Sequence, residues 1–256
     1  MSDVLTEILA AKRSRLSRGE YAPGPAAARR PTDGGAFAAS LRGPGARIIA
    51  EFKAKSPSAG ELLTHADAKV ESFALHYRRG HAAAISVVTE QDHFGGDPSW
   101  LPRMKEISGL PVLMKDFLFD ERQLDFAVSL GADAVLLIAR ALGEADLPRL
   151  RRAAADRGLA AVVEARGAVE IRRAAAVAPD VLGVNARDLA TFRTDLGSLD
   201  AMAREIPPGP VRLAESGIRT RGDVERLAAA GYEAFLVGET LLRAEDPEEE
   251  LRSLRG

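Results

Sequence analysis

The segment VRLAESGIRTRGDVERLAAAGYEAFLVG (211–238) contains one helix-like stretch between two short apolar runs. The runs, at 211–214 and 234–237, have the length of buried strands, and Ala, Leu, Arg and Glu recur between them at helical spacing. The same alternation begins near residue 47, and the starts of successive runs lie 21 to 36 residues apart, about one β-loop-α-loop unit. We predict eight strands, at 48–52, 84–88, 112–114, 134–138, 160–163, 181–184, 211–214 and 234–237.

The eight units favour an α/β fold of the (β/α)8 type, the TIM barrel. The runs show little alternation of polar and apolar residues, as expected of parallel strands that are buried on both faces. The units fill the sequence from residue 47 to 256, and no run is followed by Gly-x-Gly-x-x-Gly, the fingerprint of an open dinucleotide-binding sheet. Residues 47–256 are therefore predicted to form a single catalytic barrel domain.

Residues 1–46 are predicted to form an N-terminal helical extension. Asp3 provides an N-cap for a first amphipathic helix that we expect to cover one end of the barrel. Its apolar positions, at approximately helical spacing, are Val4, Leu5, Ile8, Leu9 and Leu16. Residues 19–46 hold six Gly and four Pro among small residues, which indicates an irregular connection.

Composition and charge narrow the class of protein. The 256 residues are 46% hydrophobic and 28% charged, enough for one large core. The 35 Lys and Arg residues nearly balance the 37 Asp and Glu residues, so no overall field points to nucleic acid or an acidic membrane surface. The longest apolar run has six residues, and the first 18 residues carry six charges, which excludes a membrane helix and a signal peptide. A cytoplasmic location is expected.

Cysteine and histidine usage argues against metal chemistry. The sequence has no Cys, which excludes disulfides, thiolate metal ligands and Cys nucleophiles. Its four His residues form no close His-x-x-x-His pair. We expect no catalytic metal.

Polar residues gather where the predicted strands end, and active sites of such barrels lie at these ends. Glu51 and Lys53 stand two residues apart at the end of the first strand and therefore project to the same side. Lys115 follows the third strand, Glu164 the fifth and Glu215 the seventh. A single Lys or Glu at a strand end is more often solvated or salt-bridged, but ionisable groups from several strands directed at one mouth indicate a functional site.

The other strand ends carry groups suited to an anion. Gly217 and Gly238 let backbone N–H groups approach a ligand closely, and the helices that follow direct their positive ends toward it. Ser56, in a Ser-Pro-Ser turn, and Arg187 add further donors. Two carboxylates are interpreted as structural, either as helix caps or as partners of an arginine: Asp116 and Asp188.

Seven segments together carry a family resemblance. They are AEFKAKSPSAG (50–60), PVLMKDFLFD (111–120), GADAVLLI (131–138), VVEA (162–165), GVNARDLATF (183–192), LAESGI (213–218) and AFLVGETLLR (234–243). Glu-x-Lys-x-x-Ser-Pro-Ser, Lys-Asp-Phe, Asn-x-Arg-Asp-Leu and Ala-Glu-Ser-Gly-Ile, in this order, are not shared by barrels at large. Over nearly its whole length the chain resembles the indole-3-glycerol-phosphate synthase family.

The resemblance implies a carboxy-lyase of tryptophan biosynthesis that uses no cofactor. Such an enzyme closes the indole ring of 1-(2-carboxyphenylamino)-1-deoxyribulose 5-phosphate, with loss of carbon dioxide and then of water. The implied partner is a small phosphorylated substrate. Neither nucleic acid nor a membrane is expected as a partner, and a monomer is the expected state.

The resemblance also implies residue roles. Lys115 resembles the general acid, Glu164 the general base, and Lys53 the lysine that holds or protonates the substrate near its carboxylate. Supporting active-site positions are Glu51, Asn185, Glu215 and Ser216. Phosphate-binding positions are Ser56, Arg187, Gly217, Gly238 and Glu239. Positions around the anthranilate ring are Phe94, Phe117, Leu136 and Leu189. Some relatives place Ser at position 239, so only the backbone N–H of Glu239 is expected to bind phosphate.

Two alternatives stay open at this point. Another phosphate-sugar barrel, such as a phosphoribosyl isomerase or the α subunit of tryptophan synthase, would carry a different acid/base pair and would lack lysines at both the first and the third strand. A non-catalytic barrel that senses a phosphate metabolite is the second, because a fold does not imply a function. The presence of Lys53, Lys115 and Glu164 argues against both. Which lysine protonates at which step is not settled by the sequence.

Overall fold

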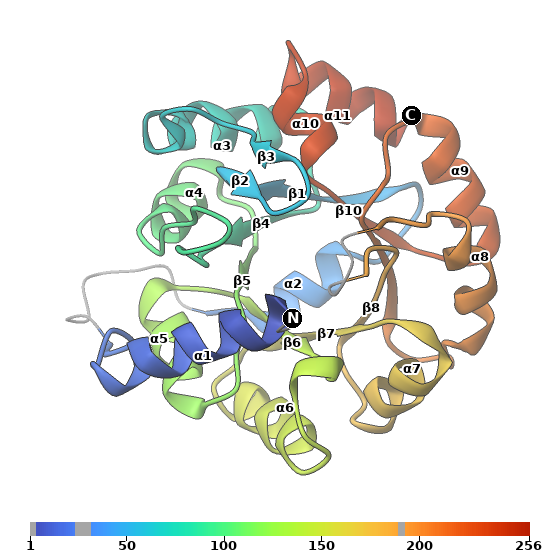
Figure 1. Cartoon of the computed structure of the whole chain (residues 1–256). Coiled ribbons are helices and arrows are strands. Elements are labelled where there is room, and N and C mark those ends of the chain that lie inside the picture. The colour runs from blue at the N-terminus through green and yellow to red at the C-terminus, as the bar shows by residue number, and fades with distance from the viewer. Residues whose placement is uncertain (1–3, 24–31, 189–192) are drawn as a thin grey trace.

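Eight parallel strands close into a barrel in the computed structural model, which describes residues 4–23, 32–188 and 193–256 (Figure 1). The strands are β1 (Arg47–Phe52), β4 (Ala84–Val88), β5 (Val112–Lys115), β6 (Ala134–Ile138), β7 (Ala160–Ala165), β8 (Val181–Asn185), β9 (Val211–Glu215) and β10 (Ala234–Val237). All eight predicted strands and the predicted fold class are confirmed. Several strands run one or two residues further than predicted, so that Lys115, Glu164, Asn185 and Glu215 lie within the sheet.

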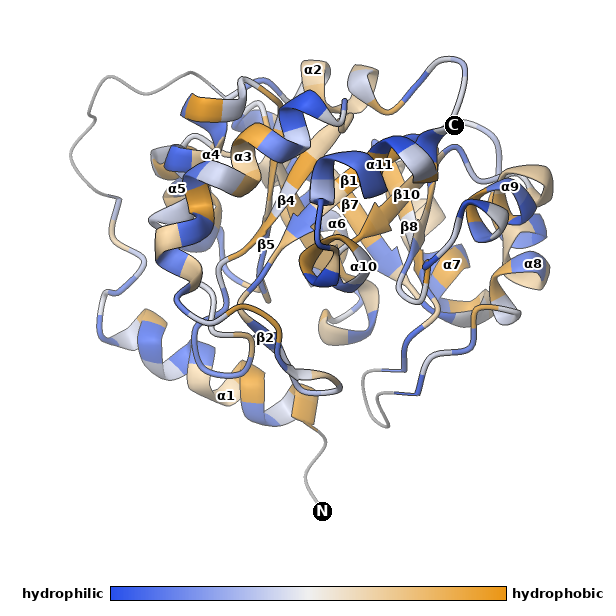
Figure 2. Ribbon diagram, turned by 90° about the horizontal axis from the view of Figure 1, so that it is seen from above, coloured by the Kyte–Doolittle hydropathy of each residue, from blue (hydrophilic) through white to orange (hydrophobic). Residues whose placement is uncertain are grey.

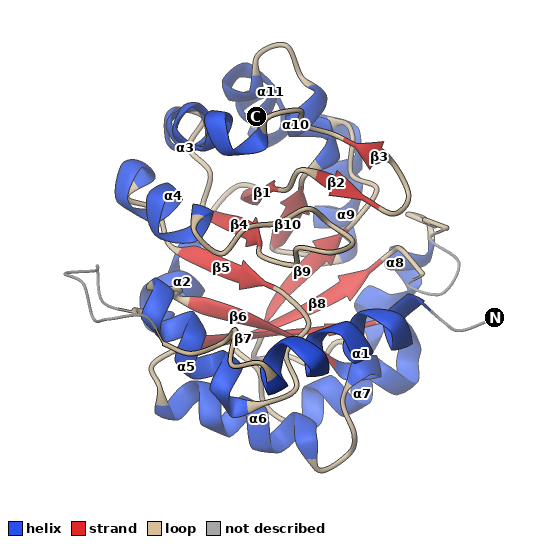
Figure 3. Ribbon diagram, turned by 60° about the vertical axis from the view of Figure 1, so that its left-hand side comes forward, coloured by secondary structure: helices blue, strands red, loops and turns tan. Residues whose placement is uncertain are grey.

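Helices surround the barrel, as Figure 3 shows with the strands enclosed by the helical layer. They are α3 (Val70–Arg79), α4 (Trp100–Ser108), α5 (Glu121–Leu130), α6 (Asp146–Asp156), α7 (Gly167–Ala176), α8 (Ser198–Met202), α9 (Arg221–Ala230), α10 (Glu239–Arg243) and α11 (Pro247–Arg255). The loop after β1 carries the short hairpin β2 (Lys55–Ser56) and β3 (Gly60–Glu61). Outward-facing strand residues pack against the helices in one continuous apolar cluster, which explains why the strands lack alternation.

The two helices found among the described residues of the extension lie on opposite sides of the barrel (Figure 2). The first predicted helix is present as α1 (Val4–Ser17), and its Leu5 and Ile8 join the apolar cluster of the barrel interior near Phe117. The predicted Asp3 cap lies outside the described residues. Lys12 of α1 is 1% exposed and forms an ion pair of 2.6 Å with Asp116.

The connection predicted to be irregular over 19–46 contains a helix, α2 (Gly34–Ser40), so that prediction was wrong for this part. Phe37 and Leu41, four residues apart, are fully buried in the barrel interior and close its lower end. Gly34 allows the helix to approach the chain before β7, because a Cβ there would lie 2.3 Å from the backbone nitrogen of Ala160. Glycine marked a close packing contact here and not a loop.

The buried carboxylate of Asp133 joins several segments at the lower end of the barrel, which is the end opposite the carboxyl ends of the strands. Asp133 accepts hydrogen bonds of 2.8 Å from Lys105 Nζ and from the backbone N–H groups of Val112 and Asp33. The last of these reaches the residue that caps α2. Among the described residues, no helix is both long enough and apolar enough to cross a membrane.

We expect Asp133→Ala to lower the free energy of unfolding by about 3 to 5 kcal/mol. The substitution removes the carboxylate that faces Lys105 and the acceptor of two backbone N–H groups, of which that of Val112 is buried. Urea unfolding followed by circular dichroism measures the loss. The matched control is Asp156→Ala at an exposed position, which should stay within about 0.5 kcal/mol. Equal effects of the two substitutions would contradict the assigned network.

Candidate active site

A cavity of about 790 Å³ opens at the carboxyl ends of the strands. Fourteen of the fifteen described site residues from the sequence line it: Glu51, Lys53, Ser56, Phe94, Lys115, Phe117, Leu136, Glu164, Asn185, Arg187, Ser216, Gly217, Gly238 and Glu239. Glu215 lies beneath the cavity, and Leu189 lies outside the described residues. Because all strands of a closed parallel barrel end on the same side, residues far apart in sequence meet here.

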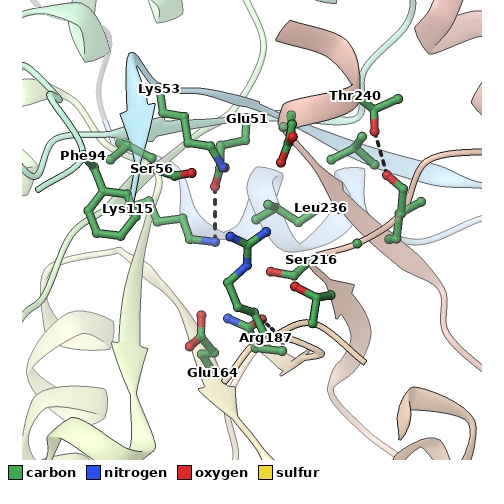
Figure 4. A pocket seen from close by; sticks show the side chains of 18 of the residues that line it. Glu51, Lys53, Ser56, Phe94, Lys115, Glu164, Arg187, Ser216, Leu236 and Thr240 are labelled. Carbon is green, nitrogen blue, oxygen red and sulfur yellow. Dashed lines mark hydrogen bonds and ion pairs between the residues drawn. The ribbon is translucent and has the colours of Figure 1, made fainter. Parts of the chain in front are cut away.

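Lys53, Lys115 and Glu51 lie together at the floor of the cavity (Figure 4), and Glu215 lies beneath them. Lys115 Nζ lies 2.9 Å from Glu215 Oε2 and 3.3 Å from Glu51 Oε2. Lys53 Nζ donates to Glu51 Oε1 at 2.5 Å, as the i, i+2 spacing on β1 predicts. Lys115 is therefore held between carboxylates from two different strands, while its amine still lines the cavity.

The opposite charges of these neighbouring groups stabilise each other's ionised forms. Burial by itself would raise the pKa of Glu51, but the neighbouring Lys53 and Lys115 outweigh it and lower that pKa to about 2. Burial likewise opposes the charged form of Lys115, and the carboxylates of Glu215, Glu51 and Glu164 overcome it and raise its pKa above the ordinary value. Glu51 is thus ionised and Lys115 protonated throughout the physiological range.

Glu164 behaves differently, although it lies in the same cavity. Burial and then the nearby charge of Glu215 raise the pKa of Glu164 to about 8, against the opposing effect of Lys115 and a hydrogen bond from Asn185. One site therefore contains a permanent anion, Glu51, and a carboxyl group that exchanges its proton close to neutral pH. Carboxyl groups with separated pKa values are typical of acid/base catalysis.

Two glycines make room for the carboxylates. A Cβ at Gly183 on β8 would lie 2.2 Å from Glu215 Oε1, and a Cβ at Gly238 would lie 2.6 Å from Glu51 Oε1. Gly238 was expected only to expose its backbone to an anion, so its contact with Glu51 is a second reason for glycine there. Gly183 was not identified from the sequence. Glu215 is 0% exposed and contacts Lys115 from below, which makes it a positioning residue.

The opposite end of the cavity is suited to an anion. Ser216 and Gly217 both have left-handed backbone conformations, with φ of 71° and 82°, at the carboxyl end of β9. A left-handed conformation is uncommon for a non-glycine residue, and of the four in the part of the chain that the structure describes, Ser216 is the one that lines the cavity. The guanidinium group of Arg187 is half-buried, points into the cavity in Figure 4, and has no hydrogen-bond or ion-pair partner among the described residues.

Two other phosphate candidates have partners within the protein. The side chain of Glu239 forms an ion pair of 3.1 Å with Arg243, which leaves its backbone N–H as the group available to an anion. The hydroxyl of Ser56 accepts a hydrogen bond from the backbone N–H of Ala59 and lies 3.3 Å from the hydroxyl of Ser58. Ser56 therefore also shapes its own turn.

Aromatic and aliphatic side chains form the apolar wall of the cavity. The rings of Phe94 and Phe117 lie 6.1 Å apart between centroids, and Leu136 lines the same cavity. Glu90, which the sequence did not identify, holds the loop that carries Phe94: its carboxylate accepts the backbone N–H groups of His93 and Phe94 at 2.7 and 2.9 Å. Glu90 lies two residues after β4 and is 1% exposed, and it is this burial, not the sequence, that reveals its role.

Both carboxylates predicted to be structural have structural partners. Asp188 pairs with Arg166 at 2.5 Å, in line with the arginine predicted for it. Asp116 pairs instead with Lys12 of α1 and accepts a hydrogen bond from the hydroxyl of Thr89 at 2.8 Å. Asp116 therefore attaches the extension to the strand end that carries Lys115.

Comparisons with known proteins agree on one family. The model of the family described as indole-3-glycerol phosphate synthase matches residues 5–254. An indole-3-glycerol phosphate synthase of Aromatoleum aromaticum is 40% identical over 265 aligned residues that cover 100% of both chains. One of Koribacter versatilis is 43% identical over 212 residues, 83% of this chain and 81% of the relative.

A solved structure supports the fold alone. The 3-hexulose-6-phosphate synthase of Salmonella typhimurium superposes with a TM-score of 0.64 at 18% identity, over 82% of this chain and 96% of that one.

Proposed function

The chain belongs to the indole-3-glycerol phosphate synthase family, and from that premise we propose the roles of individual residues in its reaction. The enzyme is a carboxy-lyase of tryptophan biosynthesis. It closes the indole ring of 1-(2-carboxyphenylamino)-1-deoxyribulose 5-phosphate through ring closure, decarboxylation and dehydration. A ring carbon attacks the C2′ carbonyl, carbon dioxide leaves to restore aromaticity, and water is then eliminated.

Lys115 is the proposed general acid. The attack on the carbonyl leaves negative charge on its oxygen, and elimination of water needs a proton on the departing hydroxyl. A charged lysine at the cavity floor meets both needs. Glu215 and Glu51 hold its amine at 2.9 and 3.3 Å, so its direction is fixed before the substrate arrives.

Glu164 is the proposed general base of dehydration, and Lys53 the proposed partner of the substrate carboxylate. The observation that carries the proposal is the opposition of a permanently charged Lys115 and a buried Glu164 with a pKa of about 8 in one cavity. Phe94, Phe117 and Leu136 line the apolar wall where the anthranilate ring would pack. All proposed catalytic side chains lie in the barrel, residues 47–256, and not in the extension, residues 1–46.

A direct assay tests the proposed site. Addition of the carboxyphenylamino-deoxyribulose phosphate should produce indole fluorescence at a rate proportional to enzyme concentration. A barrel that only senses a phosphate metabolite would bind the compound without turnover. A cytoplasmic location and a monomeric state remain predictions.

The phosphate end of the cavity is proposed to consist of Arg187 and the backbone N–H groups near Gly217 and Gly238. We expect Arg187→Ala to raise KM about tenfold or more, because a charge-assisted contact is worth roughly 1.5 to 3 kcal/mol, with little change in kcat. Inorganic phosphate should inhibit the wild type competitively and the variant less. An unchanged KM, with no phosphate inhibition of the wild type, would remove this assignment.

The pH dependence follows from the same groups. A base must be ionised to accept a proton, and Glu164 in the free enzyme has a pKa of about 8. We therefore expect kcat, which contains the dehydration step that Glu164 serves, to rise with pH and to level off above about 8, while the raised pKa of Lys115 keeps the acid protonated over this range. Initial rates at saturating substrate between pH 5.5 and 9.5 give the profile. A profile that is flat across this interval would contradict the assignment of the base.

A further inference from the structure

A second cavity, of about 240 Å³, lies beside the phosphate end of the first. We call it the outer cavity and define it by Ser58, Thr194, Glu239, Arg187, Arg219 and Arg243. All of these except Ser58 also line the main cavity, so the two spaces join. An anion that enters from solvent through the outer cavity would meet Arg187 from its outer side.

The outer cavity is strongly positive in a chain that is nearly neutral. Among the described residues that line the outer cavity, three guanidinium groups face one carboxylate, Glu239, whereas the whole chain has a formal net charge of −2. Asp223, which accepts the backbone N–H of Arg219 at 3.0 Å, lines the main cavity instead. Glu239 lies 3.1 Å from Arg243 and neutralises only that arginine. The guanidinium groups of Arg187 and Arg219 form no hydrogen bond or ion pair within the described residues. The local surplus of two positive charges equals the charge of a phosphate monoester dianion.

Arginine side chains suit this ligand in geometry as well as in charge. Guanidinium groups present parallel N–H donors that bind phosphate oxygens in pairs. Arg219 follows the β9 turn that contains Gly217, and Arg243 ends α10, which begins after Gly238. The two arginines therefore extend outward from the two loops proposed to hold the phosphate.

We propose that the outer cavity is a second anion site, which captures the phosphate group of the substrate before it moves inward past Arg187. The proposal rests on the phosphate end proposed above and adds Arg219 and Arg243 to it as capture residues. A cluster of like charges at a cavity mouth raises the local concentration of an oppositely charged ligand and its rate of association. Salt screens this effect, because Arg219 and Arg243 are exposed.

The test compares two double variants with the same change in charge. We expect Arg219→Gln/Arg243→Gln to lower kcat/KM at low ionic strength roughly tenfold or more, to keep kcat, and to flatten the decline of kcat/KM with added salt. Arg152→Gln/Arg204→Gln is the control, because both of its arginines are exposed and lie outside the lining of either cavity. Arg219→Lys/Arg243→Lys should retain most of the wild-type kcat/KM, since the charge is kept.

Each outcome is decisive. Equal kcat/KM values and salt dependence in the glutamine variant and the control would overturn the capture site, as would a fall in kcat. Glu239→Gln removes the single carboxylate and should raise kcat/KM at low salt. Inorganic phosphate is the second probe: its competitive inhibition of the wild type should weaken in the glutamine variant. If Arg187→Ala leaves KM unchanged, the inner phosphate site fails independently of the outer one.

Discussion

Lys115→Met should lower kcat by roughly 10² to 10⁴, with KM changed far less. Methionine keeps the volume of the aliphatic stem and removes the proton that the carbonyl oxygen and the departing hydroxyl require. Steady-state kinetics, followed by indole fluorescence, measure the loss of kcat. Lys69→Met, at a lysine outside the cavity, is the matched control and should leave kcat unchanged.

The same substitution leaves two buried carboxylates without their shared cation. Glu215 is 0% exposed and would lose its ion pair of 2.9 Å, so the variant should also be less stable than the wild type. Lys115→Met/Glu215→Gln removes the unpaired charge together with the acid. This double variant should recover stability against urea but not turnover, which separates the chemical role of Lys115 from its structural one.

The comparison with Lys53 decides between the two lysines. Among the described residues, Lys53 forms an ion pair with one carboxylate, Glu51 at 2.5 Å, whereas Lys115 lies between Glu51 and Glu215. Lys53→Met should therefore raise KM and lower kcat less than Lys115→Met does. If Lys53→Met abolished turnover while Lys115→Met hardly mattered, the two roles would be reversed.

The strands could be predicted because their physics is local. A run such as 134–138 is apolar on both faces, and only a strand covered by helices on one side and by the barrel interior on the other buries both. The helix α2 could not be predicted from the sequence, because its seven residues include two Gly and show no clear periodicity. Phe37 of this helix and its C-cap residue Leu41 find apolar partners only after the barrel has closed.

The residues of the candidate site could be predicted from the sequence, but the contacts between them could not. Strand ends converge in any closed parallel barrel, which is why Lys115 and Glu164 could be placed at one mouth from sequence position alone. The contact between Lys115 and Glu215 joins residues 100 positions apart and depends on register and on the space left by Gly183. Lys12 and Glu90 are single charged residues that no sequence motif marks. Their structural roles become visible only from their burial and contacts in the structure.

Glu164→Gln should separate the two halves of the reaction. Glutamine keeps the shape and the hydrogen bonding of the side chain but cannot accept a proton, so dehydration should slow by roughly 10² to 10⁴. Ring closure and decarboxylation need mainly the acid and charge neutralisation, which Lys115 and Lys53 still supply. Carbon dioxide release should therefore slow less than indole formation.

A single-turnover experiment shows the difference directly. In the variant, carbon dioxide should appear before the indole absorbance, with a lag that the wild type lacks. Substrate affinity should stay within a few-fold of the wild type, because Lys53 and Arg187 are intact. Glu106→Gln, at an exposed glutamate of α4, is the matched control and should show no lag. Glu164→Gln also removes a carboxyl group whose pKa is about 8, so the rise of kcat toward that pH should disappear with it. Equal slowing of both products would mean that Glu164 acts before decarboxylation, for example by orienting Lys115. Full activity would refute its assignment as the base.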